Sequence, residues 1–200
     1  GNMASSIIGG LIDSGHPADR ISAADPYPAS LERLRAIAPV AVFTDNTAAV
    51  AGADIIMLAV KPQVMAEAAG SIAAAVQANH ALVISIAAGV TIASMQARLG
   101  PDAAIARGMP NTPALLGCGA SGLSANSTTS AQQREFAQRV LSAVGMTCWV
   151  ETEPELDAIT ALSGSGPAYF FLLAEAMIAA AVRQGLSSDA ARILVSTTAL

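Results

Sequence analysis

The sequence predicts an α/β fold, in which a doubly wound parallel layer is followed by an all-helical segment. Two continuous apolar runs, 55–60 and 81–86, are typical of strands buried on both faces of a parallel sheet. A helical apolar pattern follows each run. After residue 152 only alanine-rich helical patterns remain. We therefore expect two parts, residues 1–152 with the sheet and residues 153–200 with helices alone.

The remaining elements follow from the same periodicities, taken in chain order. Gly15 and Pro17 end the first helical stripe. Helices are expected at 3–12, 31–37, 48–52, 64–76, 92–99, 132–144, 158–162, 168–183 and 189–200. Strands are expected at 20–24, 40–43, 55–60, 81–86, 104–107 and 147–150. The chain opens directly on a helix and stops inside a helical pattern, so we expect both ends to be truncated.

Composition excludes several classes of protein. With 53% hydrophobic and 12% charged residues, the 200-residue chain has too much apolar surface to remain disordered in water. A net charge of -5 provides no basic field for nucleic acid, so none is expected as a partner.

Cysteine, histidine and hydropathy patterns favour a soluble cytoplasmic protein without a metal. Cys118 and Cys148 form no disulfide framework, and His16 and His80 belong to no metal-spacing motif. The apolar segment 167–182 is too short to span a bilayer and contains Glu175, which predicts a buried or subunit-interface helix rather than a membrane partner. The N-terminus shows no secretory signal.

The first residues are similar to half of a phosphate-binding fingerprint. Gly1 and Ala4 would be the last two positions of G-x-G-x-x-A, with the amides of Asn2 and Met3 free to bind a pyrophosphate. A glycine that simply precedes a helix explains the same residues. Asp25 lies where a ribose-binding carboxylate is expected, which would favour NADH over NADPH, and ordinary turn chemistry explains it equally well.

Three further segments carry polar groups at strand or helix ends. Lys61 follows the strongest strand and could serve an anion, or could be a solvated lysine. Residues 107–114 form a loop with two prolines, which either presents polar groups to a ligand or is an extended linker. The Ser-Gly-Ser-Gly-Pro run at 163–167 offers free amides to a carboxylate, or is a flexible joint.

In this order, the segments resemble pyrroline-5-carboxylate reductase, the family that makes proline in the last step of its biosynthesis. The resemblance covers the whole chain. It rests on Gly1-Asn2-Met3-Ala4, Val60-Lys61-Pro62-Gln63, Ala87-Ala88-Gly89-Val90-Thr91, Met109-Pro110-Asn111-Thr112-Pro113 and Leu162-Ser163-Gly164-Ser165-Gly166-Pro167-Ala168-Tyr169. It implies a Rossmann domain, then a helical dimerisation domain, in a homodimer or an assembly of dimers.

The resemblance also implies roles for individual residues. Thr160 would be the catalytic residue, hydrogen-bonded to the ring nitrogen of L-1-pyrroline-5-carboxylate. NADPH or NADH would be the cofactor. Its binding residues would be Gly1, Asn2, Met3, Asn46, Ala59, Val60, Lys61, Pro62, Ile86, Ala87 and Ala88. The substrate carboxylate would meet Asn111, Ser163, Gly164 and Ser165.

Some features of the family are absent from the sequence. These are its first strand, its first fingerprint glycine and its C-terminal substrate loop, so we expect weak dinucleotide binding, low stability and little activity from these 200 residues alone. Two alternatives remain. One is another two-domain Rossmann reductase with an imine or hydroxy-acid substrate. Such enzymes usually have a catalytic lysine on the helical domain, and the only lysine of this chain is Lys61, which disfavours this alternative. The other is a non-catalytic dinucleotide-binding regulator.

Overall fold

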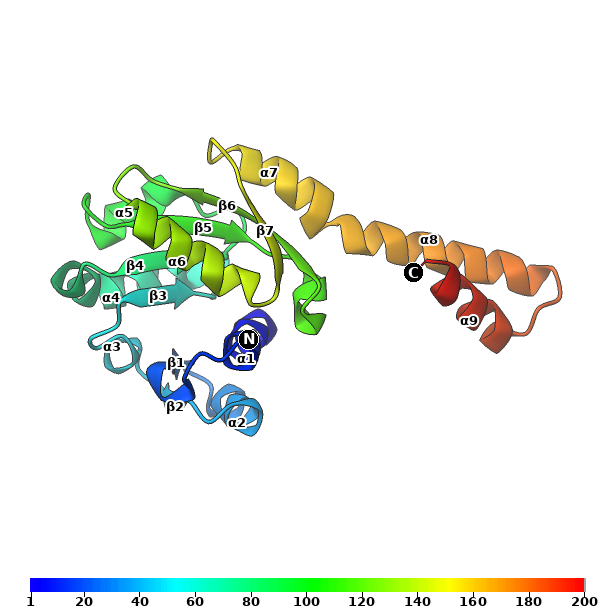
Figure 1. Cartoon of the computed structure of the whole chain (residues 1–200), viewed down its shortest axis with the longest axis horizontal. Coiled ribbons are helices and arrows are strands. Elements are labelled where there is room, and N and C mark those ends of the chain that lie inside the picture. Colours follow the sequence, from blue (N-terminus) through cyan, green and yellow to red (C-terminus); the bar gives the residue numbers. More distant parts are fainter. Residues whose placement is uncertain (200) are drawn as a thin grey trace.

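A computed structural model describes residues 1–199, in which a layered α/β body carries a long helical arm (Figure 1). The strands are β1 (Ser22–Ala24), β2 (Ala41–Phe43), β3 (Ile55–Leu58), β4 (Leu82–Ser85), β5 (Ile105–Met109), β6 (Gly119–Ala125) and β7 (Gly145–Trp149). The α-helices are α1 (Asn2–Asp13), α2 (Pro28–Ile37), α3 (Asn46–Ala49), α4 (Met65–Asn79), α5 (Ile92–Leu99), α6 (Ala131–Ser142), α7 (Glu155–Ile159), α8 (Gly166–Arg183) and α9 (Ser188–Thr198).

Both faces of the larger sheet are covered by helices, which confirms the doubly wound class. Alternate side chains of β3, β4 and β5, such as Leu58, Val83 and Ile105, pack against α4 and α5. The intervening residues, such as Ile84 and Ala106, pack against α1 and α6. Because neither face is solvated, these strands are apolar on both sides, as their continuous hydrophobic runs predict.

The larger sheet has the order β3-β4-β5-β6-β7 and contains one reversal. Strands β3, β4 and β5 are parallel, β6 runs antiparallel to β5, and β7 is parallel to β6. The sequence analysis did not predict β6, because Gly119–Ala125 is made mostly of small residues without a β-branched or aromatic signal. The strand forms because it pairs with neighbours on both sides, antiparallel to β5 and parallel to β7.

Strands β1 and β2 form a separate parallel pair. Helix α1 connects the two sheets, because Ile7 packs into the larger core while Ile8 and Ile12 pack with Leu34 of α2. The early helical stripe therefore packs on two sides: Ile7 is buried against the larger sheet, and Ile8 and Ile12 are half-buried beside the smaller one.

The arm begins after β7 and runs as one helical stretch over residues 155–183. Between α7 and α8 lies a π-helical turn, Thr160–Gly164, and α9 folds back alongside α8 (Figure 1). The sequence predicted a helix at 158–162; the structure begins it earlier and changes its hydrogen bonding at Thr160. Residue 152 lies between β7 and α7, and the division into domains at that residue stays a prediction.

Helix α7 lies directly on the sheet at Gly122 of β6. A Cβ atom at Gly122 would collide with Ile159 and would also crowd Leu156, which is 1% exposed. The absence of a side chain at Gly122 is therefore what allows α7 to approach the sheet this closely.

We predict that Gly122→Val lowers the free energy of unfolding by about 1–3 kcal/mol, because the added atoms overpack the contact between β6 and α7. Chemical denaturation measures this change. Gly70→Ala is the control, since an added Cβ at this exposed helical position meets nothing and should stabilise by up to about 1 kcal/mol. Equal stabilities of Gly122→Val and the wild type would contradict the prediction.

Candidate active site

The carboxyl ends of β3, β4 and β5 lie at one edge of the sheet, where open α/β folds bind ligands. Residues 59–62 follow β3, residues 86–88 follow β4 and Asn111 follows β5. Lys61 is exposed and makes no ion pair with any of residues 1–199. The structure thus brings most of the expected cofactor residues to a single edge.

Gly1 is the N-cap residue of helix α1, which has no side-chain cap and no acidic residue in its first turn. Its first amides are therefore available to an anion, and the helix dipole favours negative charge there. Asp25 lies nearby, since its Oδ2 is 3.9 Å from the Gly1 nitrogen. Its Oδ1 accepts a hydrogen bond from the Tyr27 N–H at 2.9 Å, which forms the expected Asx-type turn and leaves Oδ2 for other donors.

Asn46 is the first residue of α3, a short helix that Asp45 caps by accepting from the Ala48 N–H. The Asn46 side-chain amide donates to the Ser71 hydroxyl of α4 at 3.1 Å. The side-chain oxygen of Asn46 makes no hydrogen bond within residues 1–199, so it remains available as an acceptor. A role toward the adenosine ribose stays a prediction.

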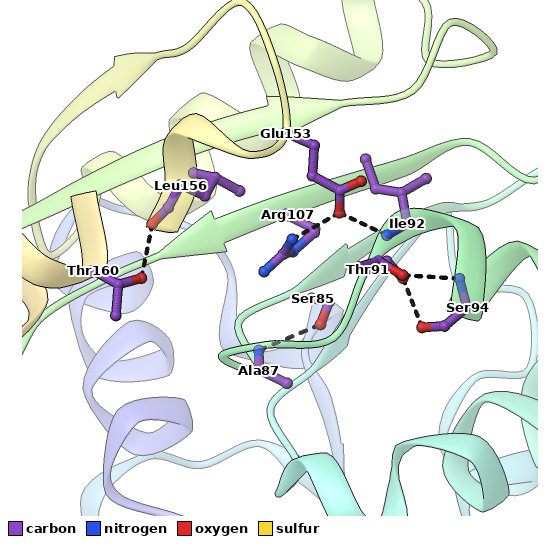
Figure 2. A network of polar contacts seen from close by, with 9 residues as sticks. All are labelled: Ser85, Ala87, Thr91, Ile92, Ser94, Arg107, Glu153, Leu156 and Thr160. Carbon is purple, nitrogen blue, oxygen red and sulfur yellow. Dashed lines mark hydrogen bonds and ion pairs between the residues drawn. The ribbon is translucent and has the colours of Figure 1, made fainter. Parts of the chain in front are cut away.

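The loop after β4 brings its backbone to the same edge with few bulky side chains. Ser85 is buried, and its hydroxyl accepts from the Ala87 N–H at 3.3 Å. Gly89 turns the chain at φ 71°, and Thr91 then caps α5 by accepting from the Ser94 N–H (Figure 2). Residues 86–91 are called the β4–α5 loop below.

Thr160 opens the π-helical turn, a feature often found at functional positions. Its hydroxyl donates to the Leu156 carbonyl at 2.7 Å, and its own carbonyl accepts from the Ser165 N–H at 2.8 Å. Since the hydroxyl proton is used within the helix, the Thr160 oxygen presents lone pairs to any further partner. The geometry leaves the Thr160 hydroxyl oxygen available as a hydrogen-bond acceptor, and its role toward a substrate stays a prediction.

Asn111 connects the turn to the sheet. Its amide donates to the Ser163 carbonyl at 3.0 Å, and its side-chain oxygen accepts from the Ala120 N–H at 2.9 Å. Gly164 packs close to Met109, and Ser165 precedes α8. Asn111 therefore fixes the position of Ser163, and the substrate contacts expected for Asn111, Ser163, Gly164 and Ser165 stay predictions.

An ion pair between β5 and the start of the arm was not predicted from the sequence. Arg107, whose side chain is 8% exposed, donates to Glu153 Oε1 at 2.7 Å, and the same oxygen accepts from the Ile92 N–H at 2.7 Å (Figure 2). The expected strand 104–107 includes Arg107, but β5 continues to Met109, so the loop expected over 107–114 begins later than predicted. One signal was available: an arginine within an apolar strand needs a buried partner.

Glu155 stabilises the start of α7. Its carboxylate accepts from the Thr152 hydroxyl at 2.6 Å and from the Thr152 N–H at 3.0 Å. These hydrogen bonds, the hydroxyl's first, hold the pKa of Glu155 below its ordinary value. The folded state thus favours the ionised carboxylate. The stabilisation is present above the unfolded pKa of Glu155 and is lost as the pH falls through the folded pKa.

We predict that Thr152→Val raises the pKa of Glu155 toward its ordinary value, because it removes the hydroxyl that contributes most to the shift. The carboxyl carbon shift of Glu155 in an NMR titration measures this. Thr197→Val is the control, since the Thr197 hydroxyl bonds the Ile193 carbonyl on α9. An unchanged Glu155 titration in Thr152→Val would contradict the assignment.

The start of α1 lacks a side-chain cap, and the parallel-strand edge carries small residues. Both features are typical of dinucleotide-binding domains, the class found in many oxidoreductases. Sequence comparisons agree with this class. The family described as "NADP oxidoreductase coenzyme F420-dependent" matches residues 1–89, and "Pyrroline-5-carboxylate reductase dimerisation" matches residues 153–200.

Two relatives show the particular family. Pyrroline-5-carboxylate reductase of Pseudomonas aeruginosa is 48% identical over 200 residues, which cover 100% of this chain and 73% of the relative. The same enzyme of Pasteurella multocida is 45% identical, and the match covers 100% of this chain and 74% of the relative. The chain belongs to the pyrroline-5-carboxylate reductase family.

Solved structures agree. The reductase of Coxiella burnetii superposes with a TM-score of 0.95 at 38% identity, covering 100% of this chain and 74% of that one. The Plasmodium falciparum enzyme, solved with NADP bound, has a TM-score of 0.87 at 27% identity. The match covers 99% of this chain and 72% of that one. A prephenate dehydrogenase of Aquifex aeolicus, at 20% identity, shares the fold alone.

Proposed function

We propose that this chain reduces L-1-pyrroline-5-carboxylate to L-proline with NADPH or NADH, the last step of proline biosynthesis. The observation that carries the proposal is 48% identity to a pyrroline-5-carboxylate reductase over the whole chain. The proposal is supported by the position of most of the expected cofactor residues at the carboxyl edge of the sheet and of Thr160 at the turn after α7. We propose residues 1–152 as the dinucleotide-binding domain and residues 153–200 as part of the helical domain.

The donor set of this chain fits a dinucleotide. The backbone at the start of α1, at Gly1, Asn2 and Met3, would hold the pyrophosphate. Asn46 would meet the adenosine ribose, residues 59–62 would line the cleft, and residues 86–88 would lie against the nicotinamide. When bound, the cofactor supplies the hydride.

The substrate is a cyclic imine whose ring nitrogen carries a proton, so its carbon accepts hydride without an elaborate acid–base apparatus. Thr160 would accept a hydrogen bond from this N–H, because its own proton is committed to the Leu156 carbonyl. Ser163, Gly164 and Ser165 would orient the carboxylate, but not through the Ser165 N–H, because this group already donates to the Thr160 carbonyl. Catalysis then rests mainly on positioning.

The test is NAD(P)H oxidation by the purified enzyme with pyrroline-5-carboxylate, with both cofactors run side by side. Turnover supports the reductase, and a preference for NADH supports a ribose contact by Asp25. Cofactor binding without turnover would favour another imine or hydroxy-acid reductase, or a regulator without catalysis.

We predict that Thr160→Val lowers kcat by about tenfold or more, because an isosteric methyl group cannot accept the iminium hydrogen bond. Steady-state kinetics measure this, and Thr160→Ser should restore most of the rate. Thr198→Val on α9 is the matched control, since its hydroxyl likewise bonds a carbonyl one turn earlier. Unchanged kinetics in Thr160→Val would remove the residue from the site.

The arm supports self-association. Within the described residues of α8, Gly166 alone is buried, and large apolar side chains are exposed along the helix. They include Tyr169, Phe170, Phe171, Leu172, Leu173 and Met177. Residues 155–183 are also long and apolar enough to cross a membrane, with a mean hydropathy of 1.5 in the most apolar window and 6% of it buried. We propose that a second copy of the chain covers this surface in a cytoplasmic homodimer, since the dimerisation family matches here.

We predict that Phe171→Glu converts the dimer to monomer at micromolar concentration, because it places a charge in an apolar interface. Light scattering coupled to size exclusion measures the mass. Gln184→Glu adds the same charge beyond the end of α8 and should leave the dimer intact. A dimer in both variants, or detergent-dependent solubility of the wild type, would contradict this assignment of the surface.

A further inference from the structure

The carboxylate of Glu153 joins segments that lie far apart in the sequence. Its Oε1 accepts from the Ile92 N–H and from Arg107 Nη1, each at 2.7 Å, across sequence separations of 61 and 46 residues (Figure 2). Ile92 is the first residue of α5, directly after the β4–α5 loop. Glu153 precedes α7 by two residues. One oxygen atom therefore links the loop, the strand β5 and the start of the arm.

This link resists displacement for electrostatic reasons. The Arg107 side chain is 8% exposed and that of Glu153 is 26% exposed, so moving the carboxylate away would leave a mostly buried guanidinium without its counter-charge. The carboxylate also lies at the N-terminus of α5, where the helix dipole favours an anion. Both hydrogen bonds are charge-assisted, and such bonds are stronger than neutral ones.

The linked segments carry the two sides of the reaction. The β4–α5 loop would hold the nicotinamide, and Thr160 lies seven residues after Glu153, about two helical turns along the arm. Between them, Leu156 and Ile159 pack closely over Gly122, so α7 cannot slide freely on the sheet. A displacement of Glu153 would change the separation between the loop and Thr160.

We propose that Glu153 is a positioning residue that sets the distance between the nicotinamide loop and the Thr160 turn, and so the distance over which hydride is transferred. The proposal rests on the proposed reductase function. It assigns Arg107 the supporting role of holding the carboxylate in place. Because hydride transfer depends on close approach of donor and acceptor, a small shift should slow the chemical step more than it weakens binding.

The test compares Glu153→Gln with Glu151→Gln. Glutamine at 153 keeps the size and one acceptor oxygen but loses the charge that holds Arg107. Glu151 is exposed in the same turn, and its side chain makes no hydrogen bond within residues 1–199, which makes it a matched control. We expect kcat to fall about tenfold in Glu153→Gln, with KM and the dissociation constant of the oxidised cofactor within about threefold of the control.

Two further readouts separate positioning from folding. The primary isotope effect with 4-deuterated cofactor should rise in Glu153→Gln, because hydride transfer becomes more rate-limiting. Hydrogen exchange at the Ile92 amide should accelerate in Glu153→Ala, which removes its acceptor. Arg107→Lys, which keeps the charge but loses the planar fork, should shift kcat in the same direction and carries the test if the Glu153 variants do not fold.

The proposal would be overturned if folded Glu153→Gln had the same kcat and the same isotope effect as the control Glu151→Gln. A loss of activity that only follows the folded fraction would also overturn it, since that is a stability effect. Absence of turnover by the wild type would contradict the proposed function instead, and exchange at Ile92 would still show whether Glu153 holds the loop.

Discussion

The position of the helical arm depends on the close contact between α7 and the bare backbone of β6 at Gly122. Leu156 and Ile159 occupy the space that a side chain at Gly122 would fill. Sheet register places Gly122 opposite Met109 and Ser124 opposite Arg107, so the face that receives α7 also carries the guanidinium. On this face, the arm is therefore held at one point by close packing over Gly122 and at another by the ion pair of Arg107 with Glu153.

The ion pair between Arg107 and Glu153 contributes more to specifying a single arrangement of the arm on the sheet than to the net free energy of folding. Removing two charges from water costs free energy that their attraction only partly offsets. A buried arginine nevertheless excludes arrangements in which its carboxylate is elsewhere, and the contact of Glu153 with the Ile92 N–H orders α5 at the same time. Asn111 adds a neutral contact to Ser163 at the far end of the turn. The arm thus meets the sheet at both ends of the segment that carries Thr160.

Helix α8 exposes a large apolar surface that no other described part of the chain covers. Its phenylalanines and leucines remain exposed after α9 has packed against it, while the π-helical turn at its start belongs to the proposed site. The proposed assembly surface and the proposed site consequently share one continuous helical stretch. A partner that covers α8 would also order the helix on which Thr160 lies, which couples stability of the site to protein concentration.

The sequence by itself determined the doubly wound class, since the runs 55–60 and 81–86 must be buried on both faces and become β3 and β4. Its ordered motifs also indicated the family. Only the folded structure shows that the small-residue segment 119–125 is a strand. Its own side chains carry no strand signal, and it forms because its backbone pairs with β5 and β7. It also decided the partner of Glu153, because hydrogen bonds across 46 and 61 residues depend on the folded path of the chain and leave no local periodicity.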